Sequence, residues 1–451
     1  MGPRNSEPIP QDELFQNRLE NLIDQGHELV RLAELIDWEV FDRQWGTLFS
    51  EKRGAPAIAT RLIAGLHYLK HTYNLSDEAV VHRWVENPYW QFFCGETYFQ
   101  HEPPCHPTSL TRWRRRIGEE GCEWLLTQTL AAAQGSGALE EKDCRRVIVD
   151  TTVQEKAVAF PTDSKLLDDA RRQLVRLAEE HGLELRQNYN RVAKHLRRKI
   201  AGYAHARQYR RMRRELKKLR TRVGRVIRDV ERQLAQHPSF VQDAFATALA
   251  QAHQILNQKP KDKGKLYSVH APEVECISKG KAHKRYEFGV KASFATTHKN
   301  GFVLGARAFP GNPYDGHTLS EQLEQAHILS GVKPQRCYVD RGYRGHGEID
   351  TQVFISGQRR GVTRTIKKEL KRRSAIEPEI GHMKNDGRLG RCYLKGREGD
   401  AMNVLLVACG HNLRKILAWL RSFFAWILGW LSAISRAPAP LPTPNYAVSA
   451  K

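Results

Sequence analysis

The change from helical to strand-like sequence near residue 145 constrains the fold of this chain more than any other feature. Upstream, apolar side chains recur at helical spacing, as in PAIATRLIAGLHYLKHTY at residues 56–73. RRVIVDTTV at residues 145–153 is too short for a helix and apolar enough for a strand buried on both faces. The pattern predicts a helical N-terminal domain over residues 1–140, followed by a second domain that begins with this strand.

Further strands are expected along the second domain. YEFGVKASFATT at residues 286–297 and GFVLGARAFPG at residues 301–311 indicate a hairpin with an Asn-Gly turn. RCYVD at residues 336–340 and QVFIS at residues 352–356 indicate two more strands. The predicted order is strand, hairpin, helix, strand, helix, strand, helix, which corresponds to a mixed α/β sheet.

Two buried strands are each expected to end on an aspartate, Asp150 after VIV and Asp340 after YV. If these strands are parallel neighbours, their carboxyl ends bring both carboxylates to one point. Mg²⁺ takes oxygen ligands of this kind, and phosphoryl transfer with two metal ions usually needs a third acid. The alternative for either aspartate alone is a turn residue at a strand end. In NPYDGHTL, a turn before a helix capped by Thr318 is preferred over a site role for Asp315 and His317.

The charge of the chain indicates a polyanionic partner. Lys and Arg number 72 against 50 Asp and Glu, a net charge of +22, and nucleic acid is the default partner of so basic a protein. Residues 186–232 hold 18 Lys and Arg and three acids, within a helical insertion expected at about 163–262. This one-sided charge favours DNA contact over a merely solvated face. The candidate contacts are Arg210, Arg211, Arg213 and Arg214.

The N-terminal domain contains a helix-turn-helix-like signal. Asn74 and Leu75 predict a turn, and Ser76 predicts the cap of the next helix. Thr108 is expected to cap a further helix, SLTRWRRRIG, which would lie against DNA or present a solvated basic face. Its candidate DNA contacts are Arg112, Arg114, Arg115 and Arg116.

The segment RRSAIEPEIGHMKNDGRLGR holds two glutamates among basic residues. Ser374 and Glu377 fit a capping box, so a helix is expected to begin at Ser374. At about 100° per residue, Lys384 returns to the face of Glu377, and Arg373 reaches the same side. Glu379 points about 200° away from Glu377, so we expect it to face outward or to pair locally. Glu377 is therefore the candidate metal ligand, with capping as the alternative. Arg373 and Lys384 are candidate DNA contacts, which would bind the phosphate next to the metal.

Several blocks together resemble a known family. VIVDTTV, CYVDRGYRG, RRSAIEPEIGHMKNDGRLGRCYLKG and NVLLVACGHNLRKIL resemble, in this order, the blocks around the catalytic acids of bacterial insertion-sequence transposases of the DDE type. Within that family they resemble insertion-sequence family five, the InsH-like group. ATRLIAGLHYLKHTYNLSDEAVVHRWVENPYWQFFCG and HPTSLTRWRRRIG resemble the helical N-terminal domain of the same group. The likeness covers most of residues 55–420.

The resemblance implies a ribonuclease H-like catalytic domain over residues 141–415, which contains the basic insertion. It implies that Asp150, Asp340 and Glu377 bind two Mg²⁺ ions, for which Mn²⁺ can substitute. The implied reaction cuts DNA at the element ends and joins the freed 3′ hydroxyls to target DNA, with no covalent protein intermediate and no nucleotide.

Around the third acid, the family pattern Y-x2-R-x3-E-x6-K is matched by Arg373, Glu377 and Lys384. Leu370 stands at the tyrosine position, a departure that affects packing or DNA contact and leaves the metal ligands intact. The implied partners are double-stranded DNA, as element ends and target, and a second subunit in a homodimer or higher synaptic complex. The alternatives are a ribonuclease H-like nuclease and a non-catalytic DNA-binding repressor derived from a transposase.

The C-terminal part, residues 416–451, contains the apolar run ILAWLRSFFAWILGWLSAI and a Pro-rich tail. A membrane span is one interpretation, but Arg421 interrupts the run, and a terminal helix docked on the core or on a partner is preferred. The eight cysteines form no CxxC pair and the N-terminus has no apolar leader segment. We therefore expect a cytoplasmic protein without a membrane anchor.

Overall fold

The computed structural model describes residues 17–49, 57–278 and 285–435, with side chains described up to residue 422. The part before the first strand is helical, as predicted. Ser76 caps α5 as expected, since its side chain accepts a hydrogen bond from the Ala79 N–H, whereas His106, not Thr108, caps α7. The helices are α1 (Leu19–Leu22), α2 (Glu28–Leu35), α3 (Glu39–Gly46), α4 (Thr60–Thr72), α5 (Asp77–Glu86), α6 (Pro88–Phe93), α7 (Pro107–Gly135) and α8 (Glu141–Cys144).

The described residues after this part form a mixed sheet of six strands, and a mixed sheet is what the alternation of strands and helices predicts. β1 is parallel to β5, β5 is parallel to β6, and β3 runs antiparallel to β1, β2 and β4. The path through the sheet is β2-β3-β1-β5-β6, and β4 also pairs with β3. The strands are β1 (Arg146–Glu155), β2 (Glu275–Ser278), β3 (Tyr286–Thr297), β4 (Val303–Phe309), β5 (Arg336–Val339) and β6 (Gln352–Ile355).

Two details of the predicted strands and helices are wrong. β1 does not end on Asp150 but continues to Glu155, which pairs with Gly289, because the polar residues after Asp150 complete a ladder with β3. The chain between β5 and β6 forms only a 3₁₀ turn, η3 (Arg341–Tyr343), in place of a helix. Asp340 does follow the last residue of β5, as predicted.

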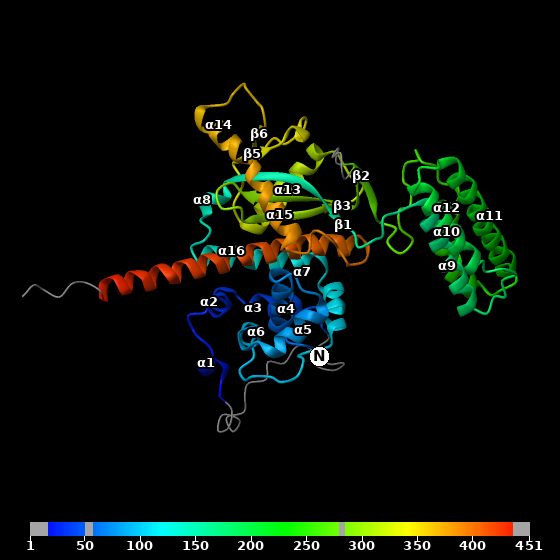
Figure 1. The fold of residues 1–451 in the computed structure, drawn as a ribbon. Coiled ribbons are helices and arrows are strands. Elements are labelled where there is room, and N and C mark those ends of the chain that lie inside the picture. The colour runs from blue at the N-terminus through cyan, green and yellow to red at the C-terminus, as the bar shows by residue number, and fades with distance from the viewer. Residues whose placement is uncertain (1–16, 50–56, 279–284, 436–451) are drawn as a thin grey trace, which may run out of the picture.

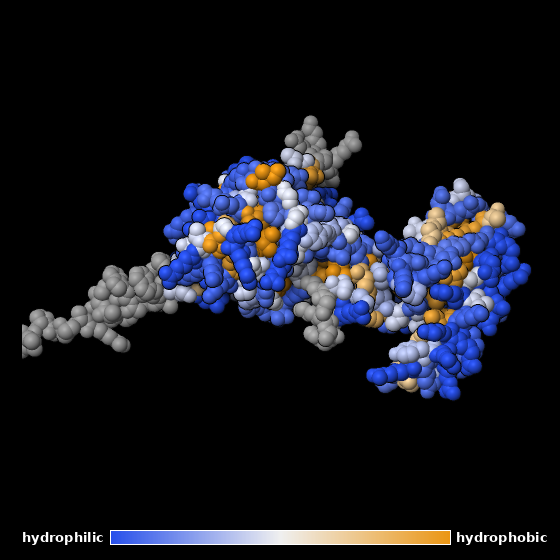
Figure 2. Space-filling model, turned by 90° about the horizontal axis from the view of Figure 1, so that it is seen from above, coloured by the Kyte–Doolittle hydropathy of each residue, from blue (hydrophilic) through white to orange (hydrophobic). Residues whose placement is uncertain are grey.

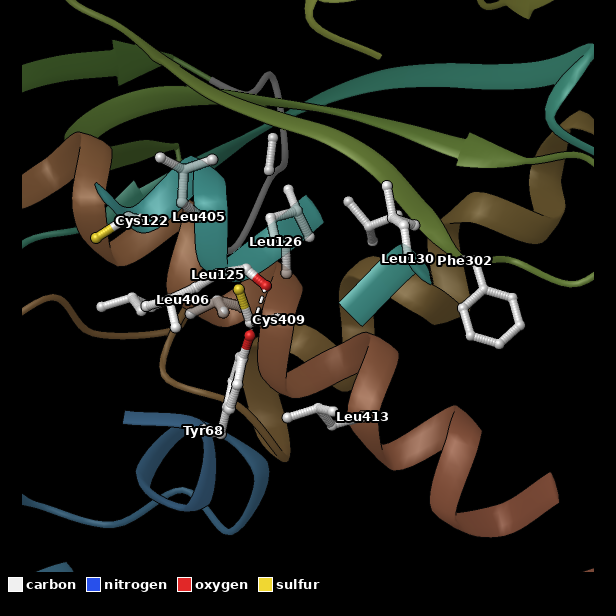
Figure 3. Close-up of a cluster of buried hydrophobic side chains, with 14 of the residues drawn as sticks. Tyr68, Cys122, Leu125, Leu126, Leu130, Phe302, Leu405, Leu406, Cys409 and Leu413 are labelled. Carbon is white, nitrogen blue, oxygen red and sulfur yellow. Dashed lines mark hydrogen bonds between the residues drawn. The ribbon is translucent and has the colours of Figure 1, made fainter. Parts of the chain in front are cut away.

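The long helix α16 joins the N-terminal helices to the sheet. It lies between the two layers in Figure 1, with α4 below it and the strands above. Figure 3 shows its side chains, among them Leu405 and Cys409, packed with those of α7, above Tyr68 of α4. The Tyr68 hydroxyl donates to the Leu125 carbonyl at 2.8 Å. The helices of this part are η2 (Asp315–Thr318), α13 (Leu319–Ser330), α14 (Arg364–Lys371), η4 (Arg372–Ala375), α15 (Ile376–Asn385) and α16 (Gly396–Ser435).

The expected boundary at residue 416 lies within α16, which runs unbroken from Gly396 to Ser435. Ile416, Leu417 and Leu420 are buried, so the first part of the apolar run is docked on the core, as preferred. Within the described part of the chain, no helix combines the length and apolar character that a membrane span requires.

The basic insertion forms four helices between β1 and β2. Figure 1 shows them beside the sheet, connected to it by extended segments. They enclose a hydrophobic core of their own, which includes Leu174, Val223 and Phe245. The helices are α9 (Asp163–Glu180), α10 (Asn190–His205), α11 (Tyr209–Leu234) and α12 (Ser239–Asn257).

Candidate active site

The two predicted aspartates lie on neighbouring parallel strands. The register pairs Arg146 with Arg336 and Ile148 with Tyr338, so two further residues along each chain bring Asp150 beside Asp340. Asp340 leaves β5 and caps η3, where its Oδ1 accepts a hydrogen bond from the Gly342 N–H at 2.8 Å. The predicted juxtaposition of the two strands is therefore confirmed.

Arg373 connects the first aspartate to the third predicted acid. Its Nη1 lies 3.4 Å from Asp150 Oδ2 and its Nη2 lies 3.0 Å from Glu377 Oε1. The Arg373 side chain is 15% exposed and that of Glu377 is 62% exposed. One guanidinium thus neutralises a carboxylate of the sheet and a carboxylate of α15, and it holds the helix over the strand.

The segment before Arg373 is anchored at the opposite end of the strands. Glu369 of α14 is buried and accepts a hydrogen bond from Arg146 Nη1 at 3.0 Å and another from the Tyr338 hydroxyl. Arg372 donates to the backbone carbonyls of His298 and Lys299 at 2.8 and 2.6 Å. These contacts fix the position from which Arg373 reaches the aspartates.

Two predictions about the glutamates are wrong. Ser374 belongs to η4 and its hydroxyl donates to the Lys371 carbonyl, so α15 begins at Ile376 without a capping box. Glu379 neither faces outward nor pairs locally, because its carboxylate lies 2.8 Å from Lys415 Nζ and 3.1 Å from His411 Nε2 of α16. Burial alone would raise the pKa of Glu379, but its hydrogen bonds to these two side chains lower it. Glu379 fastens α15 to α16.

Asp315 lies beside Asp340, although its sequence context favoured a turn residue without a role in the site. A Cβ atom added to Gly342 would lie 2.9 Å from Asp340 Oδ1 and 3.1 Å from Asp315 Oδ2, so both carboxylates approach this glycine. Lys291 Nζ lies 2.8 Å from Asp315 Oδ1, and the Thr151 hydroxyl donates to the same oxygen at 3.0 Å. Sequence reasoning missed Lys291, although a lysine inside the apolar run of β3 is a visible signal.

The pKa of Tyr343 is affected by the negative charge of this region. Its side chain is buried, and its pKa is raised well above the usual value by burial and then by the charges of Asp150, Asp315 and Asp340 among its neighbours. Three carboxylates therefore act electrostatically on one buried ring.

The donor chemistry suits a hard divalent cation, since Mg²⁺ binds carboxylate oxygens. Among the described residues, however, no three His, Cys, Asp or Glu side chains form a group that could hold a metal ion as they stand. Glu377 is exposed and paired with Arg373. Binding of a metal by all three predicted acids would therefore require Glu377 to exchange this partner.

Two sequence-family models match this chain. One, described as Transposase domain (DUF772), matches residues 17–116, and the other, described as Transposase DDE domain, matches residues 259–413. The chain belongs to the insertion-sequence DDE transposases. The second range includes Asp340 and Glu377 but not Asp150, which precedes the insertion.

A relative of the transposase is found in Rhizobium meliloti. Over 198 residues the transposase is 52% identical to the protein named "Uncharacterized protein ORF8 in nfe locus", which corresponds to 44% of this chain and 95% of that protein. No solved structure matches the transposase.

The arginines of α7 have different environments. Arg112, Arg115 and Arg116 of the transposase are exposed. Arg114 is buried, and its guanidinium lies 2.6 Å from Asp77 Oδ2 at the start of α5. The prediction that all four arginines contact DNA is therefore wrong for Arg114, which joins α7 to α5.

The candidate DNA contacts of the insertion are exposed, whereas Lys384 of α15 is half-buried. Arg210, Arg211, Arg213 and Arg214 are all exposed along the first turns of α11. Some charge of the bundle is balanced within it, as where Asp168 pairs with Arg171 and Arg197. Lys384 lies in the last turn of α15 and is half-buried.

Proposed function

We infer that Asp150, Asp340 and Glu377 are the metal-binding acids of this transposase. The observation that carries this proposal is the placement of Asp150 and Asp340 on adjacent parallel strands, with Arg373 linking Asp150 to Glu377. Two Mg²⁺ ions are the expected cofactors, and Mn²⁺ is the expected substitute. When bound, they would activate a water or 3′ hydroxyl for attack and stabilise the leaving oxygen.

The protein side chains around the acids prepare the site for DNA. Arg373 pairs with both Asp150 and Glu377, and a phosphate entering the site would offer its guanidinium a new partner. Lys291 and Thr151 keep Asp315 oriented toward Gly342, beside Asp340. Asp315 is thus held beside the turn that follows Asp340.

The strand order supports a ribonuclease H-like catalytic domain. Along β4-β3-β1-β5-β6, only β3 runs in the opposite direction to the other four strands. Asp150 lies on β1 and Asp340 directly after β5, the parallel neighbour of β1. We assign residues 1–140 to a DNA-binding domain and residues 141–415 to the catalytic domain with its insertion at about 163–262. Insertion-sequence family five remains the proposed group.

Double-stranded DNA is the proposed substrate. Its proposed contacts are Arg373, Lys384 and the exposed arginines of α7 and α11. A homodimer or higher synaptic complex is proposed because two element ends must be cut and joined together. A transposase acts where its DNA is located, so the bacterial cytoplasm is the proposed compartment.

The test uses purified protein, a labelled duplex that carries candidate element ends, and Mg²⁺. Cleaved ends joined to target DNA support the transposase reaction with these acids, provided that Asp150→Asn abolishes both products. Cuts without joining would support a nuclease, and a gel shift without chemistry would support a repressor. Products that persist in Asp150→Asn would refute the proposed site.

A further inference from the structure

A cavity of about 560 Å³ lies where the N-terminal helices meet the segment between α15 and α16. Lys70 and Arg115 line it from α4 and α7. Arg388, Tyr393 and Lys395 line it from the opposite side. Cavities of this volume admit a ligand of nucleotide size, whereas a DNA duplex is too wide to enter.

Positive charge exceeds negative charge in this cavity. Lys70 Nζ lies 2.8 Å and Arg114 Nη2 lies 2.6 Å from Asp77, so two buried cations share one carboxylate. Burial and then the charge of Arg114 lower the pKa of Lys70 to about 8. Glu78 is the other lining acid, and it is exposed. The lining cations are Lys70, Arg114, Arg115, Arg388 and Lys395.

Tyr393 adds an exposed aromatic surface to these cations. Its side chain is 61% exposed, although it also lines the cavity. The Cζ atoms of Arg388 and Arg391 lie 5.5 and 5.8 Å from its ring centroid. An aromatic ring among arginines is the arrangement on which single-stranded nucleic acids stack their bases.

The cavity lies close to the strand that carries Asp150. Cys392 forms a bridge with Lys156, directly after the end of β1, and its N–H donates to the Glu155 carbonyl at 2.7 Å. Lys156 is six residues from Asp150, which corresponds to roughly 20 Å of strand. A DNA strand covers this distance in about six nucleotides.

We propose that this cavity binds an unpaired nucleotide of the DNA strand that occupies the active site. The base stacks on Tyr393, and the phosphate contacts Arg115, Arg388 and Lys395. Inside a duplex, both faces of a base are covered by its stacked neighbours, so recognition requires local strand opening. The proposal rests on the proposed function, because it assumes that the strand held at Asp150 is DNA.

Photo-crosslinking tests the contact directly. The probe is a duplex with a short single-stranded overhang that contains 5-iodouracil, with the blunt duplex as its reference. We expect a crosslink to Tyr393, identified by mass spectrometry, and about tenfold tighter binding of the overhang duplex than of the blunt duplex. Tyr393→Leu should remove both effects, and Lys395→Gln should weaken binding of the overhang.

Tyr286→Leu is the matched control. Tyr286 is 42% exposed and its ring centroid lies 5.4 Å from Arg285 Cζ, but it does not line the cavity. Melting curves establish that the variants fold. Equal binding of both duplexes by the wild type, or an undiminished preference in Tyr393→Leu, would overturn the proposal. Asp150→Asn, which tests the proposed function, should retain the crosslink while losing cleavage, so the two hypotheses can fail separately.

Discussion

Lys156 Nζ lies 2.8 Å from Glu273 Oε1, and this ion pair ties the segment that enters the helical insertion to the segment that leaves it. The same ammonium lies 2.9 Å from Asp400 Oδ1 of α16. All three side chains are at least nine-tenths buried. The insertion is therefore fastened at its base to the helix that joins the two main parts of the molecule.

Lys156→Met should destabilise the protein by about 3–5 kcal/mol, because two buried carboxylates would lose their shared cation. The measurement is the free energy of unfolding in urea. Lys142→Met is the control, since Lys142 pairs with Glu140 at the surface and its loss should cost little. Equal effects of the two substitutions would contradict a structural role for the buried pair.

The two glutamates of α15 should respond differently to substitution. Glu377→Gln is expected to abolish Mg²⁺-dependent cleavage, because it removes a proposed metal ligand. DNA binding and Tm should change little, because the side chain is exposed and Arg373 is its only partner among the contacts described. Glu379→Gln should retain cleavage but lose about 1.5–3 kcal/mol of stability, because it weakens the bonds to Lys415 and His411. Cleavage by Glu377→Gln on the same DNA would refute its assignment as a ligand.

The exposed arginines of α11 should contribute to the salt dependence of DNA binding. Each lost phosphate contact lowers the slope of log K against log salt by about one, so substitution of all four arginines by glutamine should lower it by about three to four. Arg172→Gln with Arg176→Gln is the control, because these exposed arginines pair with acids on α9. An unchanged slope would identify the basic run as a solvated face. The four substituted residues are Arg210, Arg211, Arg213 and Arg214.

Acid should destabilise the N-terminal helices through two buried histidines. Burial and then the charges of neighbouring cations lower the pKa of His71, and burial and then Arg114 lower that of His67 to about 3. Both pKa values lie below those of the unfolded chain, so the stability is present above about pH 6.5 and is lost as the pH falls toward 3.

The loss should approach about 1.4 kcal/mol per pH unit for each histidine. Urea titrations between pH 7 and 4 measure it. His67→Gln, read against His82→Gln on an exposed face of α5, should reduce the slope. The same slope in both variants would show that other groups cause the acid sensitivity.

Paired truncations should locate where α16 stops contributing to the core. A chain that ends after Arg414 loses the buried Ile416, Leu417 and Leu420, so we expect a lower Tm and exposed apolar surface that binds a hydrophobic dye. A chain that ends after Ser422 keeps these residues and should bind less dye. Equal dye binding by the two truncated chains would contradict the docking of this part of α16.

Local signals predicted much of the fold. The hairpin of β3 and β4 follows from two apolar runs around Asn300 and Gly301, and Gly301 has the positive φ of 68° that such a turn favours. The proximity of Asp150 and Asp340 could be predicted from two apolar strands, because parallel strands align their carboxyl ends.

Contacts between distant residues account for the errors. Arg114 has the sequence context of its exposed neighbours, and only the folded position of Asp77 shows that it is buried. The helical wheel correctly turned Glu379 away from Glu377, but it could not show that α16 lies on that side. Asp315 approaches Asp340 through the meeting of two turns, which no spacing in the sequence encodes.

The position of the insertion has a kinetic consequence. Glu155 of β1 must pair with Gly289 of β3 across 133 intervening residues, and the entropy lost on closing a loop grows with its length. The four insertion helices have a core of their own, and Lys156 and Glu273 lie together at their base. If the insertion folds first as the chain is synthesised, it brings β1 to its partner at a much smaller entropic cost. The segment proposed to bind DNA would then also act as an internal folding aid for the catalytic sheet, whose central strand is translated long before its neighbours.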